Sequence, residues 1–164
     1  MSKYIKAALA SSVLVASVMG ANVANAATAN ADARANILQE ITVTKVVGTN
    51  LDFGTIITNG SAGNVVIGTN GVRGTCTLIC SGTTDAADFN VTGSNSEAVT
   101  LTVPTTVSLA GPGTAMVATL SSTSLAALDG SGNGAFSVGG SLAVNATQAD
   151  GAYIGTFTVT VEYP

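Results

Sequence analysis

The chain of 164 residues has no histidine and no tryptophan, and only 9% of its residues carry charge. Without histidine it lacks the commonest general base and metal ligand, and it cannot form a Ser-His or Cys-His nucleophile pair. Its acidic residues are scattered singly, so no carboxylate pair indicates a hydrolase. These absences argue against an enzyme, and we expect no catalytic, cofactor-binding or metal-binding residue.

Positive charge and long apolar runs are also scarce. After residue 26, three basic residues stand against nine acidic ones, which gives a net charge of −6. Binding to nucleic-acid phosphates needs the opposite balance. No stretch after residue 26 reaches 18 unbroken apolar residues, and a spanning helix needs about 20. We therefore expect no nucleic-acid partner and no membrane span in the processed chain.

The first 26 residues have the pattern of a secretory signal peptide. Lys3 and Lys6 are followed by an apolar stretch at residues 7–20, and Ala24-Asn25-Ala26 is an A-x-A cleavage signal. We expect cleavage after Ala26 and export through the periplasm to the cell surface or an extracellular fibre. The predicted organisation is a signal peptide at 1–26, an N-terminal extension at 27–36 and one domain at 37–164.

The remaining chain has a period of two. In the last segment, residues 152–164, apolar and aromatic residues at odd positions alternate with threonines and Glu162. Similar Thr- and Val-rich runs, separated by Gly, Asn, Asp and Ser, occur at 37–47, 51–57, 64–68, 75–80, 88–93, 98–103, 114–120 and 135–144. This pattern predicts an all-β, immunoglobulin-like antiparallel β-sandwich. Only residues 122–130 are compatible with a single helical turn.

The segment that follows the cleavage signal alternates most strictly. Its odd positions are small or apolar, and its even positions are polar: the odd residues are Ala27, Ala29, Ala31, Ala33, Ala35 and Ile37. As a strand, this segment supplies no neighbour for its own backbone groups and needs an acceptor edge. The alternatives are an Ala-rich tether or weak helix, as is common at chain ends, and a strand donated to another subunit. Ile41 and Val43 could be stronger anchors of that strand or part of this domain's own first strand.

Cys76 and Cys80 are the only cysteines. Export to an oxidising compartment favours a disulfide. Residues four apart in a strand lie about 13 Å apart, whereas a disulfide joins Cα atoms within about 7 Å. A local bond therefore requires a bend or bulge between the two residues. Otherwise the thiols are buried apolar groups or bond to other partners.

The C-terminus carries a recognisable combination of features. Gly151 is the fourteenth residue from the end, alternating apolar residues follow it, and Tyr163 is penultimate. This combination resembles the C-terminus of chaperone–usher pilin subunits, and Asp150-Gly151-x-Tyr153-x-Gly155 resembles a turn common near pilin C-termini. Residues 37–164 as a whole resemble a DUF4402-like family of uncharacterised secreted bacterial domains with pilin-like folds.

The resemblance implies an immunoglobulin-like sandwich that lacks its last strand and is completed by a neighbour's N-terminal extension. The inward-facing residues of the donor strand would be Ala27, Ala29, Ala31, Ala33, Ala35 and Ile37. The C-terminal assembly motif would comprise Gly151, Tyr153, Phe157, Val159, Val161 and Tyr163.

The protein would then be a structural subunit of a bacterial pilus or fimbria. Its partners would be copies of itself, a periplasmic chaperone and an outer-membrane usher. The alternative is a self-contained secreted or surface-associated immunoglobulin-like module that binds a glycan or protein ligand.

Overall fold

The computed structural model describes residues 27–164, so the predicted signal peptide lies outside the described residues. The chain divides into two units between Ala35 and Asn36, and we describe each by itself. Residues 27–35 contain no helix or strand, and all of them are exposed. The guanidinium of Arg34 and the carboxylate of Asp32 lie 3.0 Å apart and form an exposed ion pair.

The second unit, residues 36–164, contains eleven strands and no helix. They are β1 Thr42–Lys45, β2 Thr55–Ile57, β3 Gly63–Ile67, β4 Arg73–Cys76, β5 Ile79–Ser81, β6 Ala87–Thr92, β7 Thr100–Thr102, β8 Thr106–Leu109, β9 Met116–Ser122, β10 Asn133–Val144 and β11 Thr160–Glu162. Every ladder between named strands is antiparallel. The prediction of an all-β antiparallel, sandwich-like fold is confirmed.

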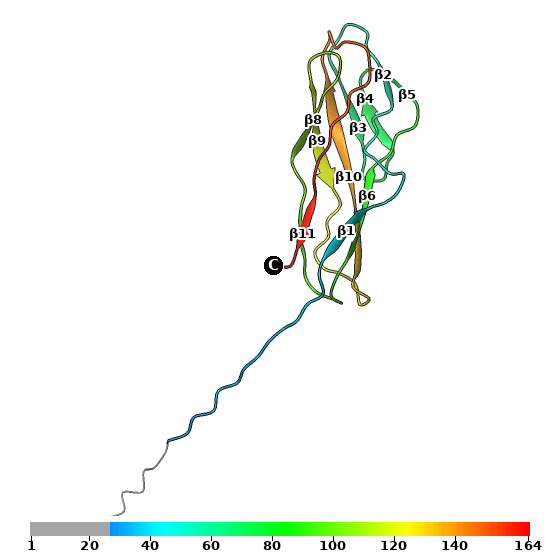
Figure 1. Cartoon of the computed structure of the whole chain (residues 1–164). Helices are drawn as coiled ribbons and strands as arrows, with labels where there is room; N and C mark the ends of the chain where they lie inside the picture. Colours follow the sequence, from blue (N-terminus) through cyan, green and yellow to red (C-terminus); the bar gives the residue numbers. More distant parts are fainter. Residues whose placement is uncertain (1–26) are drawn as a thin grey trace, which may run out of the picture. The chain divides into compact units, whose positions relative to one another are not determined.

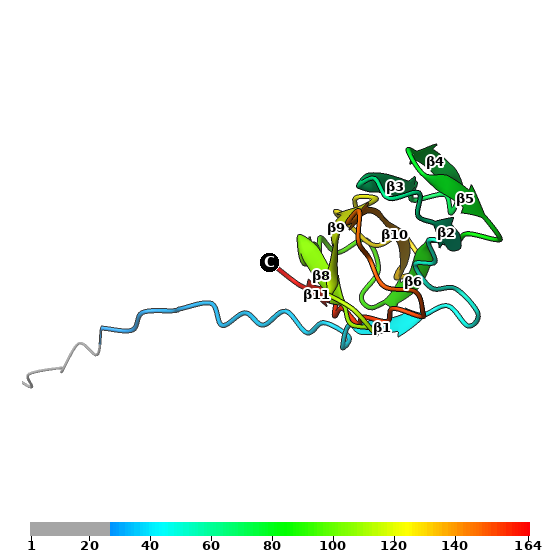
Figure 2. The ribbon, with the colours of Figure 1, turned by 90° about the horizontal axis from the view of Figure 1, so that it is seen from above.

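β10 organises the domain, because its twelve residues pair with three other strands. Its first half pairs with β6, its second half pairs with β3, and β9 pairs along its other edge. The resulting seven-stranded sheet has the order β1-β6-β10-β3-β4, and β9 and β8 branch from β10. Figure 2 shows this sheet curling around the interior. Two small sheets, β7–β11 and β2–β5, complete the fold. Figure 1 shows β2 and β5 side by side.

The core consists of two clusters of buried apolar side chains. The first cluster comprises Phe53, Val65, Ile67, Val107, Met116, Ala118, Leu142 and Val144. The second comprises Ala87, Phe89, Val91, Val99, Leu128, Phe136, Val138 and Val161. Phe157 packs against both, and its ring meets that of Phe89 edge to face at 6.4 Å. The final segment of the chain therefore crosses from one cluster to the other.

Two local expectations were wrong. Residues 122–130 form no helical turn, since Ala127 makes a β-bridge to Ala98. The final segment is not one continuous strand, because it pairs only at Ile154, which bridges Ala110, and at β11, which pairs with β7. The stretch of the opposing chain between these two contacts contains Pro104, which has no backbone N–H to donate. Residues 155–159 are outside any ladder.

Candidate functional site

An open cavity of about 640 Å³ lies in the second unit. One wall is formed by residues 51–58, and the other by residues 148–153. Leu109, Met116, Leu142 and Val144 of β8, β9 and β10 also line it. The last three of these belong to the first core cluster, so the cavity opens directly onto the hydrophobic core.

The first wall belongs to a segment that is paired on one side only, and the second wall, residues 148–153, leads into the final segment, which is also paired on one side only. Residues 52–57 pair with residues 79–85 through the β2–β5 ladder and a bridge between Asp52 and Asp85. The final segment pairs with residues 100–110 through β7 and Ala110. Within residues 27–164, neither segment has a ladder on its other side. Unpaired edges of this kind are templates for an added strand.

The final segment alternates between inward and outward residues despite its interrupted ladder. Val161 is buried and Tyr153, Phe157, Val159 and Tyr163 are half-buried, whereas the threonines between them are exposed. Tyr153 and Phe157 pack on the first cluster, and Phe157, Val159 and Tyr163 pack on the second. The residues of the predicted C-terminal motif thus share one face, and their role in assembly stays a prediction.

Gly151 begins this segment in a conformation that suits glycine. Its φ is +135°, in a region that other residues rarely adopt. A Cβ atom at this position would also lie 2.5 Å from Cγ of Pro112. Substitution of Gly151 would therefore disturb the wall of the cavity.

Two tyrosine hydroxyl groups fasten the two ends of the final segment. The Tyr153 hydroxyl accepts hydrogen bonds from Gly113 N–H (3.0 Å) and Gln148 Nε2 (2.7 Å) and donates to the carbonyl of Ala149 (3.0 Å). It closes the turn that forms one cavity wall.

Tyr163 acts at the opposite end. Its hydroxyl accepts a hydrogen bond from Ser94 N–H (2.7 Å) and donates to the carbonyl of Gln39 (2.8 Å). Gln39 lies three residues before β1, so this hydrogen bond holds the start of the second unit at the end of the final segment.

The predicted donor residues have no strand partner in the described chain. Ala27, Ala29, Ala31, Ala33 and Ala35 are exposed, and no strand includes them. Ile37, which belongs to the second unit, is 91% exposed. An isoleucine so exposed contributes nothing to its own core. The donor role of these residues stays a prediction.

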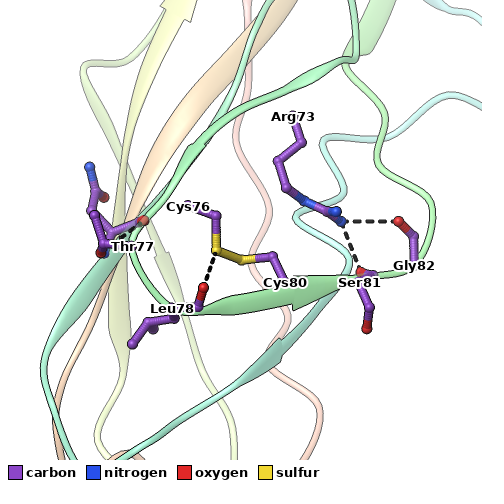
Figure 3. The surroundings of a disulfide bond; sticks show 8 residues. Arg73, Cys76, Thr77, Leu78, Cys80, Ser81 and Gly82 are labelled. Carbon is purple, nitrogen blue, oxygen red and sulfur yellow. Dashed lines mark hydrogen bonds between the residues drawn. A yellow bond between two sulfur atoms is a disulfide. The ribbon is translucent and has the colours of Figure 1, made fainter.

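Cys76 and Cys80 form a disulfide with their Cα atoms 6.4 Å apart. The predicted bend between them is present, because Cys76 ends β4 and Cys80 lies in β5 (Figure 3). The bond therefore joins two strands that belong to different sheets. Of the alternatives open at the sequence level, the local bond is the one formed.

The alternation of apolar and polar residues does not predict the cavity. The run at 51–57, which forms most of the first wall, has the pattern of an ordinary strand, and Phe53 within it is a buried core residue. A free edge depends on which strands pair over long distances, and alternation within one segment carries no such information. The glycine and tyrosine at the start of the final segment were the only local signal.

No group of three or more His, Cys, Asp or Glu residues between 27 and 164 is arranged to hold a metal ion. In the same part of the chain, no helix has the length and apolar character needed to cross a bilayer.

Comparison with known proteins gives one match. A family model described as a domain of unknown function, DUF4402, matches residues 41–163. No curated protein and no solved structure matches the chain. The matched range contains every strand and both walls of the cavity.

Proposed function

This chain belongs to the DUF4402 family, a domain of unknown function, and we propose that it is a structural subunit of a bacterial surface fibre joined by strand donation. The observation that carries the proposal is the cavity, which opens onto core residues and lies between two segments that are each paired on one side only. A strand inserted there would cover apolar surface and satisfy the unpaired backbone groups.

The N-terminal extension has the length and pattern that this site requires. Eleven extended residues, 27–37, span about 36–40 Å at 3.3–3.6 Å per residue. Residues 151–163, which contain the C-terminal motif, are similar in number. Small apolar side chains at alternate positions of the extension would face the core, and its polar residues would face solvent.

The position of Ile37 favours a donor from a second copy. Tyr163 holds Gln39 at the end of the final segment opposite the cavity. An extension folding back on its own domain would start at that end and leave Ile37 far from the cavity. An extension from a second copy, entering at the cavity and running antiparallel to the final segment, would bring Ile37 to the cavity and the alanines to the shallower remainder.

The proposal includes export and assembly partners. Residues 1–26 have the pattern of a signal peptide, and the disulfide is compatible with an oxidising compartment. By resemblance to chaperone–usher pilins, a periplasmic chaperone would occupy the groove first, and an outer-membrane usher would guide polymerisation. The resulting fibre would be a homopolymer at the cell surface without catalytic activity.

The test compares the chain that begins at Ala27 with the same chain lacking residues 27–36. We expect the complete chain to form SDS-resistant ladders on gels, and the shortened chain to form none. A synthetic peptide of residues 27–40 should bind the shortened chain and raise its thermal stability. A matched control peptide with Ala31→Asp and Ala33→Asp should do neither, because charged side chains cannot be buried against the core.

The alternative outcome defines the rival function. If the shortened chain still forms ladders, or if the complete chain is a stable monomer indifferent to the peptide, strand donation is wrong. The cavity volume falls within the roughly 300–1,000 Å³ typical of small-molecule sites. The protein would then be a self-contained binding module, and glycan or protein ligands should be screened against this cavity.

A further inference from the structure

One wall of the cavity is not part of the main sheet. Residues 55–57 form β2, which pairs only with β5, and these two strands make a separate sheet. In the described chain, no ladder joins β5 to the seven-stranded sheet. The position of β2 in this wall therefore depends on the contacts that hold β5 in place.

Two residues of β4 supply that attachment, as Figure 3 shows. Cys76 is bonded to Cys80 of β5. Arg73 donates from its guanidinium Nη2 to the carbonyls of Ser81 (2.8 Å) and Gly82 (3.0 Å). Cys76 and Arg73 are also the β4 residues in register with β3. The same two residues thus pair with the main sheet through their backbones and hold β5 through their side chains.

Ile56 of β2 also packs against the first core cluster, and further contacts hold the residues on either side of β5. The N–H of Thr77 donates to the carbonyl of Asn64 (3.0 Å), and the side chain of Leu78 packs on Gly63. These contacts fix the turn before β5 to β3. At the start of the wall, Asp52 is bridged to Asp85, which lies two residues before β6. Loss of the disulfide would therefore loosen residues 79–80 and their partners 56–57, while Arg73 would still hold Ser81 and Gly82 and both flanks would stay attached.

We propose that the Cys76–Cys80 bond and Arg73 hold the β2–β5 part of the cavity wall against the main sheet. The ability of the groove to bind a donated strand would then depend on the oxidation of this cysteine pair. The coupling to strand uptake rests on the proposed function. Reduction by a dithiol breaks the S–S bond, transfers two electrons and two protons to give two thiols, and leaves the dithiol as its own disulfide. The groove would then be competent only after the pair has been oxidised.

The size of the effect follows from the short ring that the bond closes. With a sequence separation of 4, the chain-entropy model gives a change of about 30-fold in the opening equilibrium of this loop. Amide hydrogen exchange of β2 and β5 should accelerate by about this factor on reduction. Exchange in β6 and β10 should not change.

The experiment uses the chain that begins at Ala27, oxidised, reduced with dithiothreitol, and as the Cys76→Ser/Cys80→Ser variant. Ile79→Ser is the matched control, because it places a serine on β5 at an exposed position and leaves both fastenings intact. We expect faster exchange in residues 55–57 and 79–81, and slower SDS-resistant ladder formation, in the reduced chain and the double variant but not in the control. Arg73→Met should give a smaller change of the same kind with the disulfide present.

The outcomes separate this inference from the proposed function. Unchanged exchange of β2 and β5 after reduction overturns the fastening, whatever the ladders show. Faster exchange with ladder formation as rapid as in the oxidised chain overturns the dependence of strand uptake on the wall. An oxidised chain that forms no ladders overturns the proposed function and the coupling with it, while the exchange pattern still decides whether the bond holds the wall. Reduction of the wild-type chain provides the test if the double variant does not fold.

Discussion

Replacement of Tyr163 by phenylalanine should destabilise the domain without leaving a cavity. The phenyl ring keeps the packing of Tyr163 on the second core cluster. The lost hydroxyl leaves the N–H of Ser94 and the carbonyl of Gln39 without their hydrogen bonds, which measure 2.7 and 2.8 Å. At about 0.5–1.5 kcal/mol for each bond, the free energy of unfolding should fall by about 1–3 kcal/mol.

The assay is urea denaturation with the peptide of residues 27–40 at one fixed concentration, so that any binding affects all variants equally. With an m-value of about 2 kcal/mol/M, the midpoint should fall by about 0.5–1.5 M. Thr44→Val is the matched control, because the hydroxyl of Thr44 is exposed and its contact with the carbonyl of Asn90 is 3.5 Å long. A Tyr163→Phe midpoint equal to that of Thr44→Val would refute the idea that the hydroxyl fastens the final segment.

Three further predictions concern other parts of the domain. Ile37→Asp should abolish SDS-resistant ladders, because it places a charge in the cavity of the neighbour, whereas Ile37→Val should retain them; equal ladders from both would exclude Ile37 as an anchor. Gly132→Ala should lower the free energy of unfolding in urea by more than the about 1–2 kcal/mol expected for Gly60→Ala, since both glycines have positive φ but only Gly132 lies against the carbonyl of Gly93. Backbone hydrogen bonds lower the pKa of Asp129 in the folded chain. The ionised carboxylate therefore stabilises the fold above the unfolded-state pKa, and this stabilisation is lost as pH falls through the folded-state pKa. The free energy of unfolding of Asp129→Ala should consequently fall less between about pH 5 and pH 3 than that of the wild type.

The turn that contains Asp129 shows the physical cause of this shift. The carboxylate accepts hydrogen bonds from the backbone N–H groups of Asn133 (2.9 Å) and Ser131 (2.8 Å), in that order of influence on the pKa. Both bonds favour the charged form. They also close the turn that leads into β10, as expected for a glycine-rich hairpin.

Much of the fold could be predicted from alternation within single segments. The strand containing Phe136 and Val138 and the inward face of the final segment both follow from a period of two. Geometry along the chain also predicted that a bond between Cys76 and Cys80 requires a bend. Each of these features depends on residues that are close in sequence.

The features that could not be predicted depend on pairing between distant segments. The final segment has the pattern of a continuous strand, yet Pro104, about fifty residues earlier, lies in the stretch that would have to pair with its middle. The cavity arises because residues 51–58 pair with β5 and the final segment pairs with residues 100–110, and nothing pairs between them in the described chain. A sequence pattern shows that a strand has two edges, but it does not show which edge stays free.

The hydrogen bond between Tyr163 and Gln39 also bears on the order of folding. The two residues are 124 positions apart, so a chain that emerges with its N-terminus first cannot form this contact until its last residues are available. Until then, the first strand is without this closing contact and the apolar residues of the second cluster are incompletely covered. Closure over such a long separation is slow compared with local pairing. The emerging chain therefore passes through a stage in which its edges are open to other strands, and the last step of its own folding competes with association.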